Sequence, residues 1–239
     1  VICRINDAHD AKLKGKIPYH EKYKIDHYFG YLPEPFFHKY YPKIFKYKEI
    51  FYGVEPKLYE NLTPFSKRIK EKILCSGAAA NSKLSFRLKD ILRGEQSMWK
   101  HYKLRTKCIE LPYVDYTPTL QHEYVNDQYP LLLMKYAASI ASHSLYPVIK
   151  YWENTAAGCL TFMEITEENK ANIMGFKDGE NAVFINEKNY KSKLSEFLSD
   201  PTNSKWAEIA ENGRHYTMDK LTNDSAANSL VELFKEYVN

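Results

Sequence analysis

The chain has 239 residues, 44% of them hydrophobic and 27% charged, and its formal net charge at pH 7 is +4. This balance is typical of a soluble globular protein, and the length allows one large domain or two small ones. No apolar run reaches the roughly 18 residues of a membrane-spanning helix, and the pattern of a secretory signal peptide is missing. We therefore expect a cytoplasmic protein. Because Val1 to Ile5 already resembles a strand and no Met precedes it, we also expect a longer parent chain.

The four cysteines, Cys3, Cys75, Cys108 and Cys159, lie far apart, and none of them forms a CxxC pair. This spacing does not fit a zinc site or a redox pair, so buried free thiols in a reducing compartment are the expectation. The sequence accordingly predicts no metal site and no cofactor.

Lysine alternates with tyrosine and phenylalanine early in the chain, most densely over residues 36–48. Such a pattern could stack against and neutralise single-stranded nucleic acid, or contact an anionic membrane or a phosphorylated substrate. The simpler interpretation is a tyrosine-rich core covered by lysine stems. Because no nucleic-acid motif accompanies the charge, we expect no nucleic-acid partner and keep a peripheral membrane contact open.

Two regions of the chain differ in composition and in secondary-structure pattern. Residues 1–66 are rich in Tyr, Lys and Pro, whereas strand and helix patterns alternate from about residue 70 onward. The polar stretch 55–67 contains two prolines and is typical of a linker. We therefore expect a short N-terminal portion of one domain, residues 1–66, followed by an α/β domain, residues 67–239.

The hydrophobic periodicity of the second region predicts alternating strands and helices. The expected strands are 72–75, 108–111, 137–141, 159–163 and 182–185, and the expected helices are 82–93, 95–105, 127–136, 147–157, 167–174, 190–199, 204–213 and 223–238. In helix 82–93, Leu84, Leu88, Ile91 and Leu92 share one face. Alternation of this kind predicts a Rossmann-like parallel sheet flanked by helices, with ligands bound beyond the carboxyl ends of the strands.

The first of these strand ends is the turn Ser76-Gly77-Ala78. A glycine there lets a ligand approach the backbone, and the helix behind it would offer free N–H groups to a phosphate, with Arg87 one turn further on. Neither GxGxxG nor the Walker pattern is present, so an ordinary strand-to-helix turn is the favoured interpretation of this segment alone.

A second candidate is the helix start that carries Lys150, Glu153 and Asn154 on one face. A glutamate at this place can accept two hydroxyl hydrogen bonds from a sugar or ribose. A surface pair between Lys150 and Glu153 would need no function and would contribute only about 0.2–0.5 kcal/mol. The residues by themselves leave both interpretations open.

Residues 142–159, SHSLYPVIKYWENTAAGC, resemble the donor-site segment of GT-B glycosyltransferases, closest to the group-1-like subset related to spore-maturation glycosyltransferases. In that subset a basic residue, an aromatic residue, Glu and a small-small-Gly step recur. Residues 174–185, MGFKDGENAVFI, resemble the next segment of the same domain. The similarity extends over about residues 70–239 and departs at Leu145, where the family pattern has an acidic residue eight positions before Glu153.

The resemblance implies that the chain binds a nucleotide-diphosphate sugar through a C-terminal domain and transfers the sugar without a metal. Glu153 would hold the ribose or phosphate end of the donor and would count, with His9, among the catalytic residues. The remaining donor-binding positions implied are Ser76, Gly77, Ala78, Arg87, His143, Ser144, Tyr146, Lys150 and Asn154.

The N-terminal portion would then belong to the acceptor-side domain of the two-domain enzyme. His9 or Asp10 follows a predicted strand and could serve an acceptor hydroxyl as a base. A polar turn with a capping Asp10 is the favoured alternative. Because a complete acceptor domain does not fit before residue 60, we expect this domain to be truncated or reduced.

A second hypothesis is a non-catalytic α/β module that binds a partner through the Tyr/Lys-rich first region. Leu145 and the short N-terminal portion favour it. The sugar, the nucleotide and the acceptor, whether a sugar, a lipid-linked molecule or a protein, are not specified by the sequence.

Overall fold

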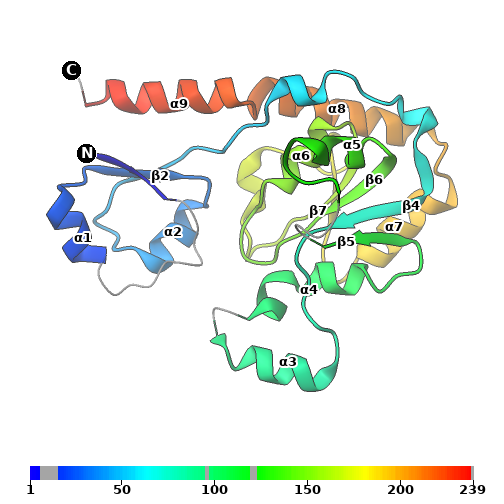
Figure 1. Ribbon diagram of the computed structural model, residues 1–239, viewed down its shortest axis with the longest axis horizontal. Helices are drawn as coiled ribbons and strands as arrows, with labels where there is room; N and C mark the ends of the chain where they lie inside the picture. The colour runs from blue at the N-terminus through cyan, green and yellow to red at the C-terminus, as the bar shows by residue number, and fades with distance from the viewer. Residues whose placement is uncertain (6–15, 95–96, 119–122, 238–239) are drawn as a thin grey trace. The chain divides into compact units, whose positions relative to one another are not determined.

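The computed structural model describes residues 1–5, 16–94, 97–118 and 123–237 (Figure 1). By its internal contacts the chain divides into two units, one made of Val1–Gly53 with Leu221–Asn239 and the other of Val54–Lys220. The expected boundary between residues 66 and 67 therefore lies inside the second unit, and the last helix belongs to the first.

The first unit contains a parallel three-stranded sheet in the order β1-β2-β3. Its elements are β1 (Ile2–Arg4), α1 (Lys16–Tyr23), β2 (His27–Gly30), α2 (Glu34–Tyr40), β3 (Tyr47–Glu49) and α9 (Asn223–Lys235). Tyr237, which follows α9, contacts β2 of the sheet: its hydroxyl lies 2.7 Å from His27 Nδ1.

The aromatic residues of the Tyr/Lys-rich region form the core of this unit. Phe37 is fully buried, and its ring stacks on Tyr47 with centroids 4.1 Å apart and on Tyr41 at 4.4 Å. Tyr28 and Phe45 are also buried and stack on each other. These rings are therefore packed together, as the simpler interpretation of the sequence expects, and do not form an exposed stacking surface.

The second unit is built around a parallel five-stranded sheet in the order β5-β4-β6-β7-β8, which confirms the predicted α/β fold class. Its strands are β4 (Ile69–Ser76), β5 (Val114–Thr117), β6 (Tyr136–Ala141), β7 (Leu160–Glu164) and β8 (Val183–Ile185). Its α-helices are α3 (Leu84–Ile91), α4 (Met98–Cys108), α5 (Tyr129–Leu133), α6 (Lys150–Ala156), α7 (Tyr190–Ser199) and α8 (Ser204–Lys220). Short 3-10 helices are η2 (Pro56–Tyr59), η3 (Phe65–Lys67), η5 (Asn126–Gln128) and η6 (Ala171–Met174).

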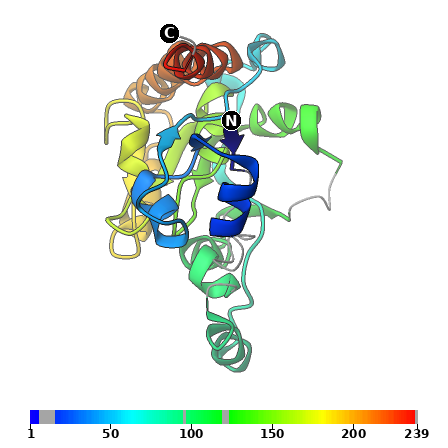
Figure 2. The same cartoon turned by 90° about the vertical axis from the view of Figure 1, so that its left-hand side faces the viewer.

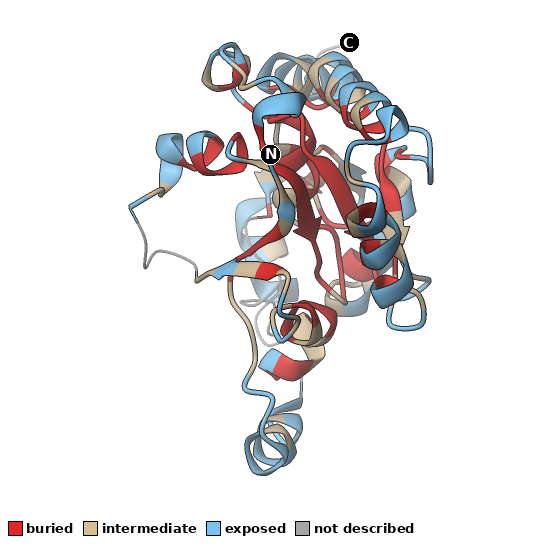
Figure 3. Ribbon diagram, turned by 90° about the vertical axis from the view of Figure 1, so that its right-hand side faces the viewer, coloured by how far each residue is buried: buried red, intermediate tan, exposed pale blue. Residues whose placement is uncertain are grey.

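The central strands are buried on both faces because helices cover each side of the sheet (Figures 2 and 3). Ile73 and Cys75 of β4 join one core cluster together with Leu104 of α4 and Phe197 of α7. Burial on both faces explains why these strands read as continuous apolar runs rather than as alternating patterns.

Several sequence predictions about single elements were wrong. The expected helix 167–174 is a turn followed by the 3-10 helix η6. The apolar run 108–111 was expected to be a strand, but Cys108 ends α4 and the strand is β5, Val114–Thr117. A short apolar run fits a buried helix end as well as a strand, which is why periodicity did not separate them. Asn212-Gly213 was expected to end a helix, but α8 continues through it to Lys220.

Candidate functional site

The site at the carboxyl end of β4 begins with a hydrogen-bonded turn. Ser76, the last residue of β4, places its hydroxyl 2.5 Å from the Tyr129 hydroxyl, and both residues are buried. Gly77 follows with φ +111°, a backbone conformation that side chains disfavour. Its carbonyl accepts a hydrogen bond of 2.8 Å from Tyr116 of β5. Hydrogen bonds from Tyr129 and Tyr116 therefore hold the turn on two sides.

Two cationic side chains converge on Gly77. A Cβ atom at this position would lie 2.7 Å from Arg105 Nη1 and 3.1 Å from Lys150 Cε. Glycine is required here because these side chains occupy the space that any larger residue would need. Positive charge from α4 and α6 is thus concentrated at one strand end, which favours an anion.

Arg105 holds the turn against the neighbouring strand. Its Nη1 donates to the Ala78 carbonyl at 3.0 Å, and its Nη2 donates to the Ser142 carbonyl just after β6. The side chain is buried, and its Nε has no hydrogen-bond partner within the described chain. Sequence reasoning missed Arg105 because the three segments it joins are distant in the sequence, and no local spacing marks it.

Lys150 is the first residue of α6 and is partly buried. Its Nζ lies 4.2 Å from the centre of the Tyr129 ring, and no described carboxylate comes within 4.0 Å of it. Burial, assisted by the charge of Arg105 and opposed by Glu153, lowers the pKa of Lys150 to about 8. Lys150 is therefore a cation at neutral pH whose charge is only weakly compensated by the protein.

Glu153 lies one turn along α6 from Lys150 and is also partly buried. Burial raises the pKa of its carboxyl, and the nearby Lys150 charge opposes that rise. The pKa values of Tyr59 and Tyr129 are raised by burial and, next, by the Glu153 charge, so the carboxylate lies near both phenols. The shared face of Lys150 and Glu153 that the sequence predicts is present.

Three other predicted residues are buried in the packing behind the turn. Asn154 accepts a hydrogen bond from the Tyr129 hydroxyl at 3.5 Å. His143 places Nε2 3.3 Å from Nδ1 of His101, and the Tyr146 ring packs 4.1 Å from the His143 ring. His143 and Tyr146 thus pack within the loop between β6 and α6, whereas Asn154 lies in α6 itself.

Arg87 does not lie at the Gly77 turn. Arg87 lies in α3, where its guanidinium carbon is 3.7 Å from the centre of the Trp99 ring. The arginine at Gly77 is Arg105 instead. His9, with its neighbour Asp10, lies outside the described residues.

A cavity of about 850 Å³ lies at the carboxyl ends of β7 and β8. Of the predicted site residues that the structure describes, only Ser144 lines it. The most buried charged residue among those that line it is Glu164, which accepts hydrogen bonds from Ser142 at 2.6 Å and from Ser144 at 3.2 Å. Burial raises the pKa of Glu164, and these hydroxyls oppose the rise. Lys100 and Lys103 also line the cavity, so it offers both donors and acceptors to a hydroxylated ligand.

Within the described residues, no group of His, Cys, Asp and Glu is placed to hold a metal ion, and no helix is long and apolar enough to cross a membrane.

Searches against protein families and against curated proteins found no match. Solved structures do match, among them HepE from Anabaena in complex with UDP, with a TM-score of 0.64 at 10% identity over 98% of this chain and 72% of that one. A glycosyltransferase from Rickettsia africae matches with a TM-score of 0.55 at 14% identity over 95% and 80%. TarM from S. aureus matches with a TM-score of 0.58 at 12% identity over 96% and 47%.

The chain therefore has the fold of GT-B glycosyltransferases over nearly its whole length. At these identities the similarity shows the fold, and function has to be argued from the side chains.

Proposed function

We propose that this chain is a glycosyltransferase that moves a sugar from a nucleotide-diphosphate sugar to an acceptor still to be identified. The observation that carries the proposal is the convergence of Arg105 and Lys150 on Gly77 at the end of β4. The resemblance of residues 142–159 to a donor-site segment of the group-1-like subset supports it, as does the fold, since HepE has been solved with UDP and with UDP-glucose.

The diphosphate would lie against the Gly77 turn. Because Gly77 has no Cβ atom, the Arg105 guanidinium and the Lys150 side chain can approach the turn closely. Lys150 supplies a charged donor, since no described carboxylate lies within 4.0 Å of its Nζ. Arg105 adds a second positive charge, and its hydrogen bonds to the Ala78 and Ser142 carbonyls hold the turn in place. When the sugar is transferred, negative charge develops on the leaving diphosphate. Cations that are already fixed at that place stabilise this charge.

Glu153 would bind the ribose. It follows Lys150 by one helical turn, so a nucleoside whose phosphates reach Lys150 brings its ribose hydroxyls near the Glu153 carboxylate. A carboxylate accepts two such hydrogen bonds, each of them charge-assisted. Burial raises the pKa of Glu153 and leaves Lys150 as its main charged neighbour, which suits a ligand site better than a solvated surface pair.

The proposed donor site differs from the family pattern at Leu145. Leu145 is buried, and no carboxylate occupies the position where the family pattern has an acid. Contacts to the sugar must therefore come from other groups, among which Ser144 is partly exposed beside the cavity. This departure favours, as a second candidate, a module that binds a nucleotide sugar without transferring it.

The proposal predicts that Glu153→Gln weakens UDP binding about 10-fold to 150-fold, as expected for loss of a hydrogen bond to a charged group. Isothermal titration with UDP and with 2′,3′-dideoxyuridine diphosphate checks it. The unchanged protein should prefer UDP, and Glu153→Gln should lose that preference because the ribose hydroxyls are what Glu153 recognises.

Glu110→Gln, which alters an exposed carboxylate of the same unit, serves as the matched control and should leave both affinities unchanged. Equal loss of affinity for the two nucleotides in Glu153→Gln would show that Glu153 does not contact the ribose. Release of UDP from UDP-glucose then separates the two candidates, since a binding module releases none.

A further inference from the structure

Helix α3 exposes an unusual amount of apolar surface. Leu84, Leu88, Ile91 and Leu92 are between 52% and 87% exposed, and the helix has no buried residue. In both views of the ribbon α3 lies apart from the five-stranded sheet of its unit (Figures 1 and 2). The sequence identifies this apolar face without indicating what covers it, and the structure leaves it exposed.

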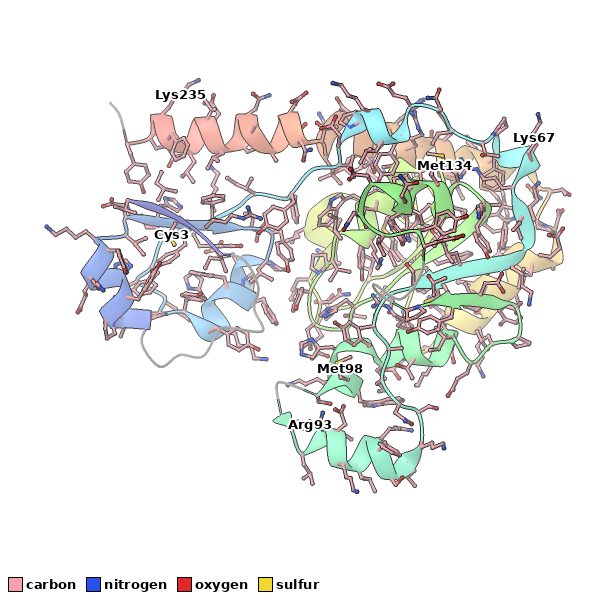
Figure 4. All side chains as sticks on the ribbon, viewed as in Figure 1. Cys3, Lys67, Arg93, Met98, Met134 and Lys235 are labelled. Carbon is pink, nitrogen blue, oxygen red and sulfur yellow. The ribbon has the colours of Figure 1, made fainter. Side chains whose placement is uncertain are left out.

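Polar contacts attach the opposite side of α3 to α4. The Arg87 guanidinium lies over the Trp99 ring at 3.7 Å. Asp90 accepts hydrogen bonds of 2.7 Å from the Ser97 hydroxyl and from the Trp99 backbone N–H. Because these two residues face α4, the side of the helix with Leu84, Leu88 and Leu92 is held outward. Figure 4 shows side chains standing free around the helix near Arg93.

The exposed part of the helix is also basic. Lys83, Lys89 and Arg93 are all exposed, and the single acidic residue of segment 83–93 is Asp90. Asp90 accepts hydrogen bonds from α4 and also lies 3.9 Å from Arg93 Nη1. Leucines flanked by such cations are complementary to an anionic lipid surface, where apolar side chains enter the headgroup region and cations meet phosphates. A second copy of the chain would instead bring like charges together.

We propose that α3 docks the chain on an anionic lipid bilayer, with Leu84, Leu88 and Leu92 entering the interface and Lys89 and Arg93 contacting phosphate headgroups. The docking is peripheral, since no described helix is long and apolar enough to cross a membrane. This inference rests on α3 alone and does not depend on the proposed donor site.

Vesicle flotation of the full chain tests the proposal, using phosphatidylcholine alone and phosphatidylcholine with about one third phosphatidylglycerol. We expect binding only to the anionic vesicles and its loss in high salt. Leu88→Gln/Leu92→Gln and, separately, Lys89→Gln/Arg93→Gln should each reduce the bound fraction roughly tenfold. The control Leu131→Gln/Val231→Gln alters exposed leucine and valine side chains elsewhere and should bind as the unchanged protein does.

Three results would overturn the proposal. The first is no binding to anionic vesicles, or binding that the α3 variants do not reduce. The second is a dimer, seen by sedimentation, that Leu88→Gln/Leu92→Gln converts to monomers, since a second copy would then cover the face. The third is a clearly lowered melting temperature of that variant, since another part of the protein would then pack on α3.

Discussion

Replacing Lys150 with Met is expected to weaken UDP binding at neutral pH by at least about tenfold, because it removes a charge-assisted contact with the diphosphate. Methionine preserves the apolar stem over the Tyr129 ring, so the fold around α6 should persist. Binding of uridine, which has no phosphate, should change little. Titration calorimetry with both ligands measures the difference.

Lys191→Met is the matched control, because Lys191 also lies over a tyrosine ring, that of Tyr190, but on α7 and away from the Gly77 turn. Its UDP affinity should equal that of the unchanged protein. An equal loss for UDP and uridine in Lys150→Met would indicate a general disturbance of the site rather than the loss of a phosphate contact.

Lys150 should also make UDP binding weaker at alkaline pH. Lys150 has a pKa of about 8 and is charged below it, so UDP affinity should fall as the pH rises through that value. Bound phosphate favours the ammonium form and moves the decline to somewhat higher pH. Titrations between about pH 7 and pH 10 should show the decline in the unchanged protein and not in Lys150→Met.

Gly213→Ala is expected to destabilise the protein by about 2 kcal/mol, although alanine usually stabilises a helix interior by about 1 kcal/mol relative to glycine. A Cβ atom at Gly213 would lie 2.4 Å from the Asn181 carbonyl oxygen and 3.3 Å from Thr155 of α6. The added methyl group therefore has to displace the backbone or separate α8 from α6. Urea unfolding measures the change.

Glu211→Ala, an exposed change two residues earlier on α8, should alter the free energy of unfolding by no more than about 0.5 kcal/mol. If Gly213→Ala proved as stable as the unchanged protein or more so, the close approach of α8 to the Asn181 backbone would be contradicted.

Gly213 also shows where local sequence rules reach their limit. Asn-Gly is a strong turn signal, and it predicted the end of a helix. The structure continues the helix because a neighbouring backbone approaches so closely that only glycine fits. The parallel sheet was predictable, since buried strands alternating with helices leave few alternatives, but such close approaches depend on segments far apart in the sequence.

The candidate site shows the same division. Periodicity predicts that Ser76 and Gly77 lie at a strand end and that Lys150 and Glu153 share a helix face, whereas their proposed role as a donor site came from the family resemblance. Arg105 could not, since it joins the Gly77 turn to the end of β6 from the far end of α4. The amphipathic face of α3 was recognised in the sequence, but its exposure was not, because periodicity identifies an apolar face without saying what covers it.

The central claim is that the Gly77 turn with Lys150, Arg105 and Glu153 binds a nucleotide diphosphate. Titration calorimetry of the unchanged chain with UDP, GDP and ADP, repeated with Glu153→Gln and Lys150→Met, tests this most directly. The account predicts saturable binding of at least one of these nucleotides at a single site, weakened in both variants. Absence of binding by all three, or binding that neither variant alters, would contradict it.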